Sequence, residues 1–202
     1  MLSIDPKKNT ERENYKLLIG SIIPRPIAFV TSISQDGVLN GAPFSYFNIV
    51  SSNPPLVSVS IQRSGGKQKD TARNILETKE FVIHVVDNLN VDQINQTAAS
   101  LPPNQSEISL ANLTPIESTQ ISVPGVKEAK VRFECKLEHS VELGGVDTPG
   151  TDLIIGKIVQ VHIDEKIYED GRIDPIGLGA VSRLAGTNYA KIGEIFSIER
   201  PR

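Results

Sequence analysis

Short apolar segments alternate with turn residues along most of the chain. Between Leu56 and Ile61, apolar and hydroxyl residues alternate strictly, which is the pattern of a strand buried on one face. Residues 27–34 form an apolar, β-branched run, and Gln35-Asp36-Gly37 behind it is typical of a hairpin turn. Residues 81–86 are another run of strand length. The pattern predicts a hairpin followed by further strands.

Two longer strand-like runs occupy residues 129–143 and 153–163. A glycine-containing loop over residues 144–150 separates them, so antiparallel pairing across that loop is the simplest arrangement. Residues 177–189 are interpreted as a glycine-punctuated loop, which leads to a short extended segment over residues 194–199.

Helical patterns are few and short. Residues 70–78 predict a helix with Ala72, Ile75 and Leu76 facing inward and with Asp70 or Thr71 as the N-cap. A second short helix is expected over residues 91–99. Residues 100–125 contain four prolines and are expected to leave the sheet, in a region suited to substrate-facing variation.

These elements favour a mainly β fold with a few short helices, organised as a closed or nearly closed antiparallel barrel. A doubly wound parallel sheet is disfavoured because no long helices alternate with the strands. Pro24 and Pro26 exclude a helix around them. Residues 1–20 are interpreted as an N-terminal arm or short helix, and residues 21–202 as a single domain.

Charge and composition narrow the functional classes. The 202 residues contain 21 Lys plus Arg against 24 Asp plus Glu, a balance that does not create the basic field that nucleic-acid binding requires. No apolar run approaches the roughly 20 residues of a membrane helix. Proline and charges near the N-terminus do not match a secretory signal, and the single cysteine fits a reducing compartment. We expect a cytoplasmic protein with no nucleic-acid or membrane partner.

Familiar catalytic and nucleotide motifs are absent or incomplete. Gly65-Gly66-Lys67 lacks the spacing and the following hydroxyl of a phosphate-binding P-loop, and Gly177-Leu178-Gly179 does not lie between a strand and a helix. The three histidines have no second ligand at metal spacing, so surface or hydrogen-bonded core positions are expected. Cys135 lies within a predicted strand, and no serine occupies a nucleophile elbow. We predict no metal site and no protein nucleophile.

Three segments offer groups suited to an aromatic ring or a phosphate. They are Val30-Thr31-Ser32, the small, aromatic and amide residues 40–48, and Lys69-Asp70-Thr71 at a predicted helix start. Taken singly, each is more often only a strand end, a bulge or an N-cap.

Together these segments resemble the flavin reductase-like family of FMN-binding split barrels, which includes flavoredoxins and nitrilotriacetate monooxygenase component B. The resemblance rests on the motifs PRPIAFVTS (24–32), APFSYFN (42–48), NPPLVSVSI (53–61) and KDTARNI (69–75). It is colinear from about residue 20, and RLAGTNYAKIGEIFSIERP resembles the family's closing segment. Four spaced motifs in order are more specific than any one alone.

The resemblance implies a homodimeric split β-barrel that holds FMN near the subunit interface. The implied phosphate contacts are Lys69 and Thr71, and the implied ribityl and ring contacts are Thr31, Ser32, Ser45, Phe47 and Asn48. Arg25 and Arg183 are weaker candidates, for a nicotinamide-nucleotide phosphate or for structural pairing. Asp70 is assigned to capping because a carboxylate repels a phosphate. The remaining secondary candidates are Ala42, Pro43, Tyr46 and Tyr189.

The implied activity is NAD(P)H:flavin oxidoreduction, in which the flavin and not a side chain carries the chemistry. Such an enzyme can supply reduced FMN to a partner monooxygenase. The alternative is a flavoredoxin-like electron carrier without its own NAD(P)H turnover, and a third interpretation is a flavin-free barrel. One branch of the family carries Gly-Asp-His near a late strand, where this chain has Gly150-Thr151-Asp152-Leu153. This difference moves weight toward the flavoredoxin-like alternative.

Overall fold

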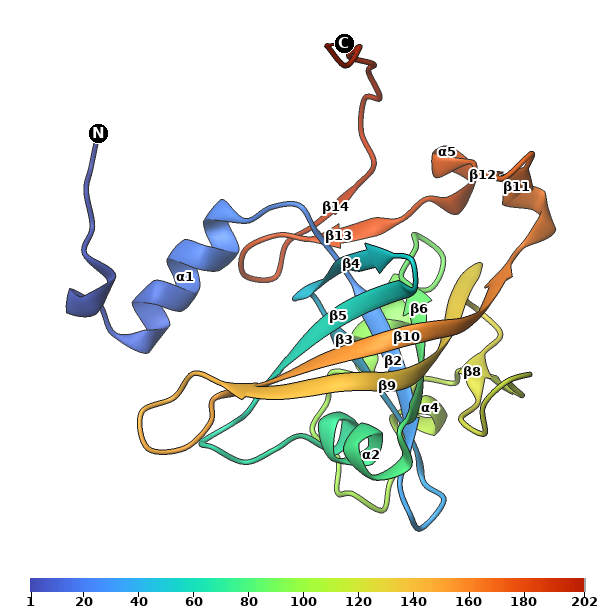
Figure 1. The fold of residues 1–202 in the computed structure, drawn as a ribbon, viewed down its shortest axis with the longest axis horizontal. Helices are drawn as coiled ribbons and strands as arrows, with labels where there is room; N and C mark the ends of the chain where they lie inside the picture. The colour runs from blue at the N-terminus through green and yellow to red at the C-terminus, as the bar shows by residue number, and fades with distance from the viewer. Residues whose placement is uncertain (202) are drawn as a thin grey trace.

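The computed structural model describes residues 1–201. Its main sheet has seven antiparallel strands in the order β3–β2–β6–β9–β10–β5–β4 (Figure 1). The bounds are β2 Ala28–Ile33, β3 Leu39–Phe44, β4 Phe47–Ser52, β5 Pro55–Gln62, β6 Glu80–Val85, β9 Val131–Leu143 and β10 Thr151–Ile163. The mainly β class, the β2–β3 hairpin and the β9–β10 pair are confirmed.

The two edge strands of this sheet are neighbours in the chain. The sheet curls until β3 also contacts β5, and only Ser45 and Tyr46 separate β3 from β4. Within the described residues no backbone ladder joins β3 to β4. The barrel is therefore open along one line, which we call the seam.

Smaller elements surround the barrel. Three short ladders consist of β1 Arg25–Pro26, β13 Val181–Arg183 and β14 Tyr189–Lys191; β7 Pro115–Ile116 and β8 Gly125–Val126; and β11 Tyr168–Glu169 and β12 Arg172–Ile173. The helices are η1 Pro6–Lys8, α1 Glu11–Ser21, α2 Asp70–Thr78, α3 Val91–Gln96, α4 Glu107–Leu110, η2 Glu165–Ile167 and α5 Pro175–Leu178. Residues 194–199, expected as a short extended segment, belong to no helix or strand. In the described part of the chain, no helix combines the length and hydrophobicity needed to cross a bilayer.

Strands β2 and β5 differ in how their outer faces are covered. In β5, Val57, Val59 and Ile61 pack inside the barrel while the serines between them face outward. In β2, Ala28 and Val30 also point inside, but Phe29 on the other face is fully buried in a second apolar cluster with residues of α3 and α4. The segment between β6 and β9 thus covers the outside of β2.

A buried histidine fixes this cover. One ring nitrogen of His84, Nε2, accepts a hydrogen bond from the Val126 backbone N–H at 2.9 Å, so Nδ1 carries the proton and donates to the Phe29 carbonyl at 3.0 Å. Burial lowers the pKa of His84 to about 4. The ring is therefore neutral near pH 7 and joins β6, β2 and β8, as a hydrogen-bonded core histidine should.

The start of α2 differs from the prediction. Its N-cap is Lys69, which makes no side-chain cap bond, so the prediction of Asp70 or Thr71 as N-cap is wrong. The Thr71 hydroxyl instead donates inward to Asn40, and Asp70 pairs with Arg73 at 2.7 Å within the first turn. Helix α3 also ends at Gln96, three residues earlier than expected.

Candidate functional site

Three adjoining hollows form a groove along the seam. We call them the seam hollow, the central hollow and the helix hollow, with volumes of about 380, 150 and 290 Å³. The seam and central hollows share Arg25, Ser45, Tyr46 and Ser60, and the central and helix hollows share Pro43, Phe44 and Lys69. The groove therefore runs from β4 to the amino end of α2.

The seam hollow combines apolar walls with a polar floor. Leu18 and Ile22 of α1 line one side together with Pro24 and Pro26. Phe47 and Asn48 of β4, and Ser58 and Ser60 of β5, line the other. The serines reach the hollow because the alternation of β5 turns its even-numbered side chains away from the barrel core. Such a surface suits a flat ring with polar edges.

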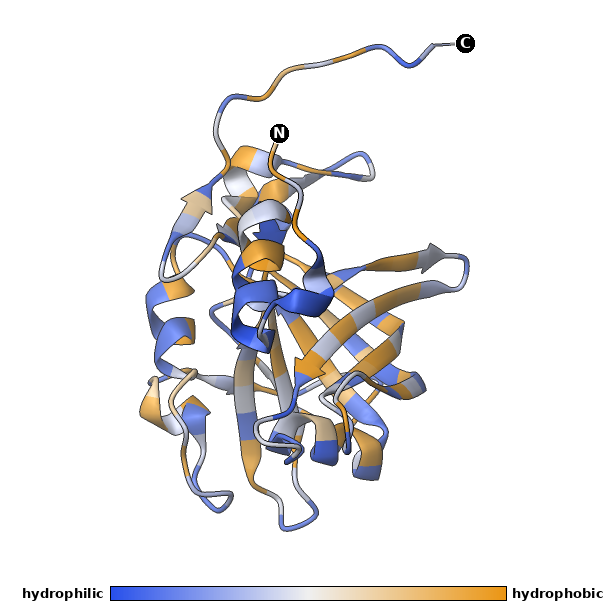
Figure 2. Cartoon of the chain, turned by 90° about the vertical axis from the view of Figure 1, so that its left-hand side faces the viewer, coloured by the Kyte–Doolittle hydropathy of each residue, from blue (hydrophilic) through white to orange (hydrophobic). Residues whose placement is uncertain are grey.

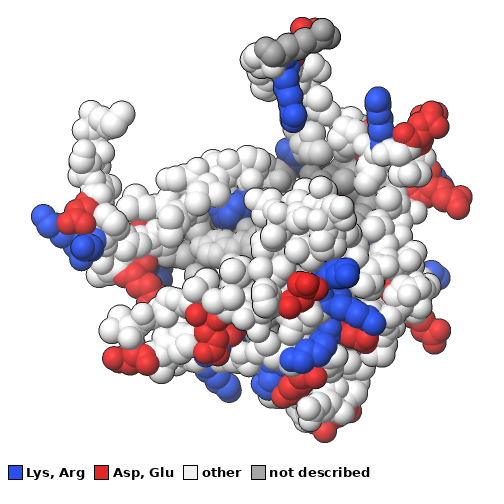
Figure 3. All heavy atoms as spheres, in the orientation of Figure 1, with Lys and Arg blue, Asp and Glu red and all other residues white. Residues whose placement is uncertain are grey.

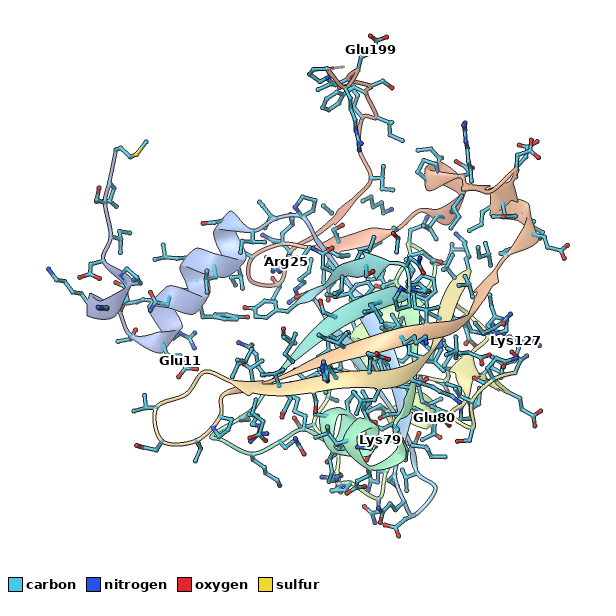
Figure 4. The ribbon with its side chains drawn as sticks, in the orientation of Figure 1. Glu11, Arg25, Lys79, Glu80, Lys127 and Glu199 are labelled. Atoms are coloured by element: carbon cyan, nitrogen blue, oxygen red, sulfur yellow. The ribbon has the colours of Figure 1, made fainter. Side chains whose placement is uncertain are left out.

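Arg25 joins the elements around the groove (Figure 4). Its buried guanidinium donates to the carbonyl oxygens of Ile19 at 2.7 Å and Ile22 at 2.6 Å, at the carboxyl end of α1. It also donates to the Leu184 carbonyl at 2.9 Å and to Ser45 Oγ at 3.5 Å. Two roles were considered for Arg25, contact with a nicotinamide-nucleotide phosphate and structural pairing. These contacts correspond to structural pairing.

Cationic and aromatic side chains meet in the central hollow. The Lys69 ammonium lies 5.8 Å from the centre of the Phe44 ring. Burial, together with the neighbouring Tyr15, raises the pKa of Tyr46. Arg183 enters from β13, where its guanidinium lies 4.4 Å from the centre of the Tyr189 ring and donates to the Gly186 carbonyl at 2.6 Å.

Beneath the helix hollow is a buried hydrogen-bond network. Asn40 Nδ2 donates to Glu107 at 2.8 Å, and Asn40 Oδ1 accepts from Thr71 at 2.9 Å. Asn74 donates to Ser32 Oγ at 3.2 Å. Burial raises the pKa of Glu107. The network holds the hydroxyls of Thr71 and Ser32 inside the protein.

The structure brings most of the predicted site residues to one groove. Those lining it are Arg25, Ala42, Pro43, Ser45, Tyr46, Phe47, Asn48, Lys69, Asp70, Thr71 and Arg183. Thr31 and Ser32 are fully buried outside it, and the Thr31 hydroxyl donates to the Pro124 carbonyl at 2.7 Å. Tyr189 does not line the groove, and its hydroxyl donates to Asn95. Neither Thr31 nor Ser32 is placed to touch a molecule in the groove.

Several lining residues escaped sequence reasoning. Tyr15 and Leu18 belong to residues 1–20, Ile22 follows them directly, and no sequence signal indicated that these residues form a wall of the groove. Ser58 and Ser60 had a signal in the strict alternation of their strand, which places hydroxyls on the face opposite the core.

The chemical groups that line the groove suit a ligand with a phosphate at one end and an aromatic ring at the other. The helix end of the groove offers a cation and helical N–H groups, and its seam end offers apolar, hydroxyl and amide groups. Cys135 is buried in the barrel, where desolvation raises its thiol pKa. Within residues 1–201, His, Cys, Asp and Glu side chains form no group of three suited to a metal ion.

An open antiparallel barrel with a groove along its seam defines the split-barrel class. Within that class, the chain belongs to the flavin reductase-like family, because the family model described as "Flavin reductase like domain" matches residues 19–177. The sequence is 53% identical to the protein YwrF of Bacillus subtilis over 195 residues, which cover 94% of each chain.

Solved structures agree with this assignment. Nitrilotriacetate monooxygenase component B from Bacillus cereus has 62% identity and a TM-score of 0.97, with 98% of each chain covered. A putative flavin reductase with a split barrel domain from Shewanella frigidimarina has 22% identity and a TM-score of 0.85 over the whole of both chains, which shows the fold alone. The split-barrel class and the family resemblance are confirmed.

Proposed function

We propose that this chain binds FMN in the seam groove and acts as an NAD(P)H:flavin oxidoreductase. The observation that carries the proposal is that Lys69, at the amino end of α2, and Phe47 and Asn48, at the seam, lie on one continuous groove. A cation at one end and a ring-sized hollow at the other match the two ends of a flavin mononucleotide.

The phosphate would lie at Lys69. The first N–H groups of α2 have no helical partners and concentrate positive potential there, and the Lys69 ammonium adds a full charge. Thr71 is not a side-chain contact in this arrangement, because its hydroxyl is held by Asn40.

The ring would lie in the seam hollow. Ser45, Asn48 and Ser60 would orient its polar edge by hydrogen bonds, while Leu18, Ile22 and the prolines would exclude water from its apolar part. FMN, when bound, supplies the hydride and electron chemistry, so the protein's contribution is binding, orientation and exclusion of water.

The second candidate function is that of an electron carrier without NAD(P)H turnover. The observation that favours it is the missing histidine: one branch of the family carries Gly-Asp-His near a late strand, where this chain has Gly150-Thr151-Asp152-Leu153. The Asp152 carboxylate in this segment accepts hydrogen bonds from Arg63 and Gln68.

The deciding experiment has two stages. The purified protein is first titrated with FMN and with riboflavin, and quenching of flavin fluorescence gives both dissociation constants. FMN should bind more tightly than riboflavin because of the phosphate site. NADH and NADPH oxidation is then followed with added FMN. Turnover with either donor supports the enzyme, binding without turnover supports the carrier, and no flavin binding removes both proposals.

We further propose that two copies of the chain associate beside the groove. Helix α1 buries only Ile19, although a helix of 11 residues is marginal without packing. Ile49 of β4 is 77% exposed, and Phe196 of the C-terminal tail is 75% exposed. Figure 1 shows α1 and the tail standing away from the barrel, Figure 2 shows apolar residues along both, and Figure 3 shows the tail projecting from the body of the molecule. A second copy covering α1 would close the seam hollow, since Leu18 and Ile22 line it.

Light scattering and a variant of an exposed side chain outside the groove test this association. Wild-type protein should have twice the chain mass, and Leu17→Glu should shift it toward the monomer and weaken FMN binding at micromolar concentration. Monomeric wild-type protein would refute the dimer.

In the reductase proposal, the partner is a monooxygenase that would receive reduced FMN from this dimer. The proposed compartment is the cytoplasm, where the unpaired Cys135 stays reduced.

A further inference from the structure

The loop of residues 63–69, which joins β5 to α2, is held at both ends by one buried carboxylate. Asp152 of β10 is 2% exposed. Its Oδ2 accepts from Arg63 Nε at 2.9 Å, at the start of the loop, and its Oδ1 accepts from Gln68 Nε2 at 3.0 Å, beside Lys69. We call these three side chains the Asp152 clamp.

The remainder of the loop is also ordered by internal backbone bonds and by contacts to the connection between β9 and β10. The Arg63 N–H donates to the Gly150 carbonyl at 2.8 Å, and Ser64 and Lys67 exchange two backbone hydrogen bonds. Gly66 has a φ of +75°, and a Cβ there would lie 2.6 Å from Thr148 Oγ1. These contacts hold the middle of the loop, and the clamp holds its two ends.

The charge of Asp152 suits it to this task. Burial alone would raise its pKa, but the hydrogen bonds from Arg63 and Gln68 lower the pKa overall, so the carboxylate is ionised at neutral pH. An ionised carboxylate only accepts hydrogen bonds, and charge-assisted bonds are stronger than neutral ones. Both donors on Asp152 come from the loop.

Lys69 depends on this loop for its position. It is the N-cap of α2 but makes no side-chain cap bond, and its side chain is long and flexible. The backbone of Lys69 and the first N–H groups of α2 follow directly on the loop, while the Phe44 ring and the bond from Thr71 to Asn40 hold the same end of the helix from the other side. Gln68 is the residue directly before Lys69.

We propose that Asp152 is a positioning residue for phosphate recognition, acting through Gln68 and Arg63 to place Lys69 and the first turn of α2. The inference rests on the proposed function, since it takes FMN as the ligand. It also gives a role to the acidic residue at the point where the chain departs from Gly-Asp-His. The ring contacts come from β4, α1 and the outward face of β5, and none of these lining residues takes part in the hydrogen bonds of the clamp.

The test compares FMN with riboflavin, which differ only in the phosphate. Two variants open the clamp: Gln68→Met removes its bond to Asp152 while keeping the volume, and Asp152→Asn removes the charge. Glu142→Gln is the matched control, because Glu142 also accepts from Arg63 but is largely exposed and touches no other loop residue. The measurements are both dissociation constants and the melting temperature of each flavin-free protein.

Gln68→Met should weaken FMN binding about fivefold, the effect of one lost hydrogen bond, and Asp152→Asn should weaken it more. Riboflavin binding should stay within about twofold of wild type in both, and Glu142→Gln should leave both flavins within twofold. Equal losses for FMN and riboflavin, or unchanged FMN binding in Gln68→Met, would overturn the clamp alone. A wild-type protein that binds neither flavin would overturn the proposed function and the clamp together.

Discussion

Strands β2 and β5 both carry hydroxyl side chains, yet only those of β5 reach the groove. Thr31 of β2 is buried beneath the segment between β6 and β9, where its hydroxyl donates to the Pro124 carbonyl, and Ser32, on the opposite face of the strand, is buried against Asn40 of β3 and Asn74 of α2. Ser58 and Ser60 of β5 lie on a face that no other segment covers completely. The difference shows that the cover on a strand, and not its residue types, decides whether its polar groups can serve a ligand.

The cover over β2 should be sensitive to acid through His84. Its folded pKa of about 4 is below the ordinary value of 6.5, so the unfolded chain takes up a proton that the folded chain does not. Stability should therefore fall as the pH decreases from about 6.5 to about 4, by on the order of 3 kcal/mol from this group. Denaturant unfolding at several pH values measures the change.

A His84→Gln variant provides the control, because glutamine does not titrate. It should be less stable than wild type at pH 7 but lose less stability over the same pH range. Equal losses in the two proteins would mean that another group causes the acid sensitivity.

At the helix end of the groove, Lys69→Glu tests the phosphate position. It removes a charge-assisted contact and introduces repulsion, so FMN binding should weaken by roughly 2 kcal/mol or more. Riboflavin binding should change far less. Lys136→Glu, at an exposed position of β9, makes the same charge change away from the groove and should leave FMN affinity near wild type. Fluorescence titration measures the FMN affinity of both variants. If Lys69→Glu binds FMN as tightly as wild type, the phosphate lies elsewhere.

Thr31→Val addresses the covered strand directly. Because it removes the donor to the Pro124 carbonyl, we expect a loss of about 1–2 kcal/mol in unfolding free energy with no change in FMN affinity. Thermal and denaturant unfolding measure the first, and flavin titration the second. Weaker FMN binding with unchanged stability would mean that Thr31 contacts the flavin, which is the role that the family resemblance implies.

Ser60→Ala makes the opposite change on β5 and should have the smallest effect. Losing one half-exposed hydroxyl in the groove should weaken FMN binding by about 0.5–1 kcal/mol and leave the melting temperature unchanged. A lower melting temperature without a change in affinity would mean that the serine supports the barrel and not the ligand.

Local patterns predicted most of the barrel strands because those strands have signals of their own, whereas β4 was not predicted because residues 40–48 show no clear alternation. The hairpin over β2 and β3 has a turn sequence, β5 has strict alternation, and β9 and β10 flank a glycine loop. The β13–β14 pair was not predicted, because three-residue strands between glycines have no period to detect. What covers β2 was equally invisible, since it depends on how a proline-rich segment returns to the barrel.

The candidate site shows the same limit. Lys69, Ser45 and Asn48 were predicted as site residues from the family resemblance of their motifs, and the structure places them on one groove. Thr31 and Ser32 match their motif equally well, but their direction is set by tertiary contacts. The wall from α1 depends on Arg25 binding the end of that helix, a contact that no local pattern encodes.

The absence of a ladder between β3 and β4 has a mechanical consequence. Elsewhere in the main sheet, separating two neighbouring strands breaks a row of N–H to carbonyl bonds, whereas opening the seam between β3 and β4 breaks no such row, and the Tyr46 carbonyl stays bonded to the Ser60 N–H on the β5 side. We therefore expect the barrel to widen at lower cost along the seam than between two paired strands, and the groove beside it to accommodate rings of differing bulk.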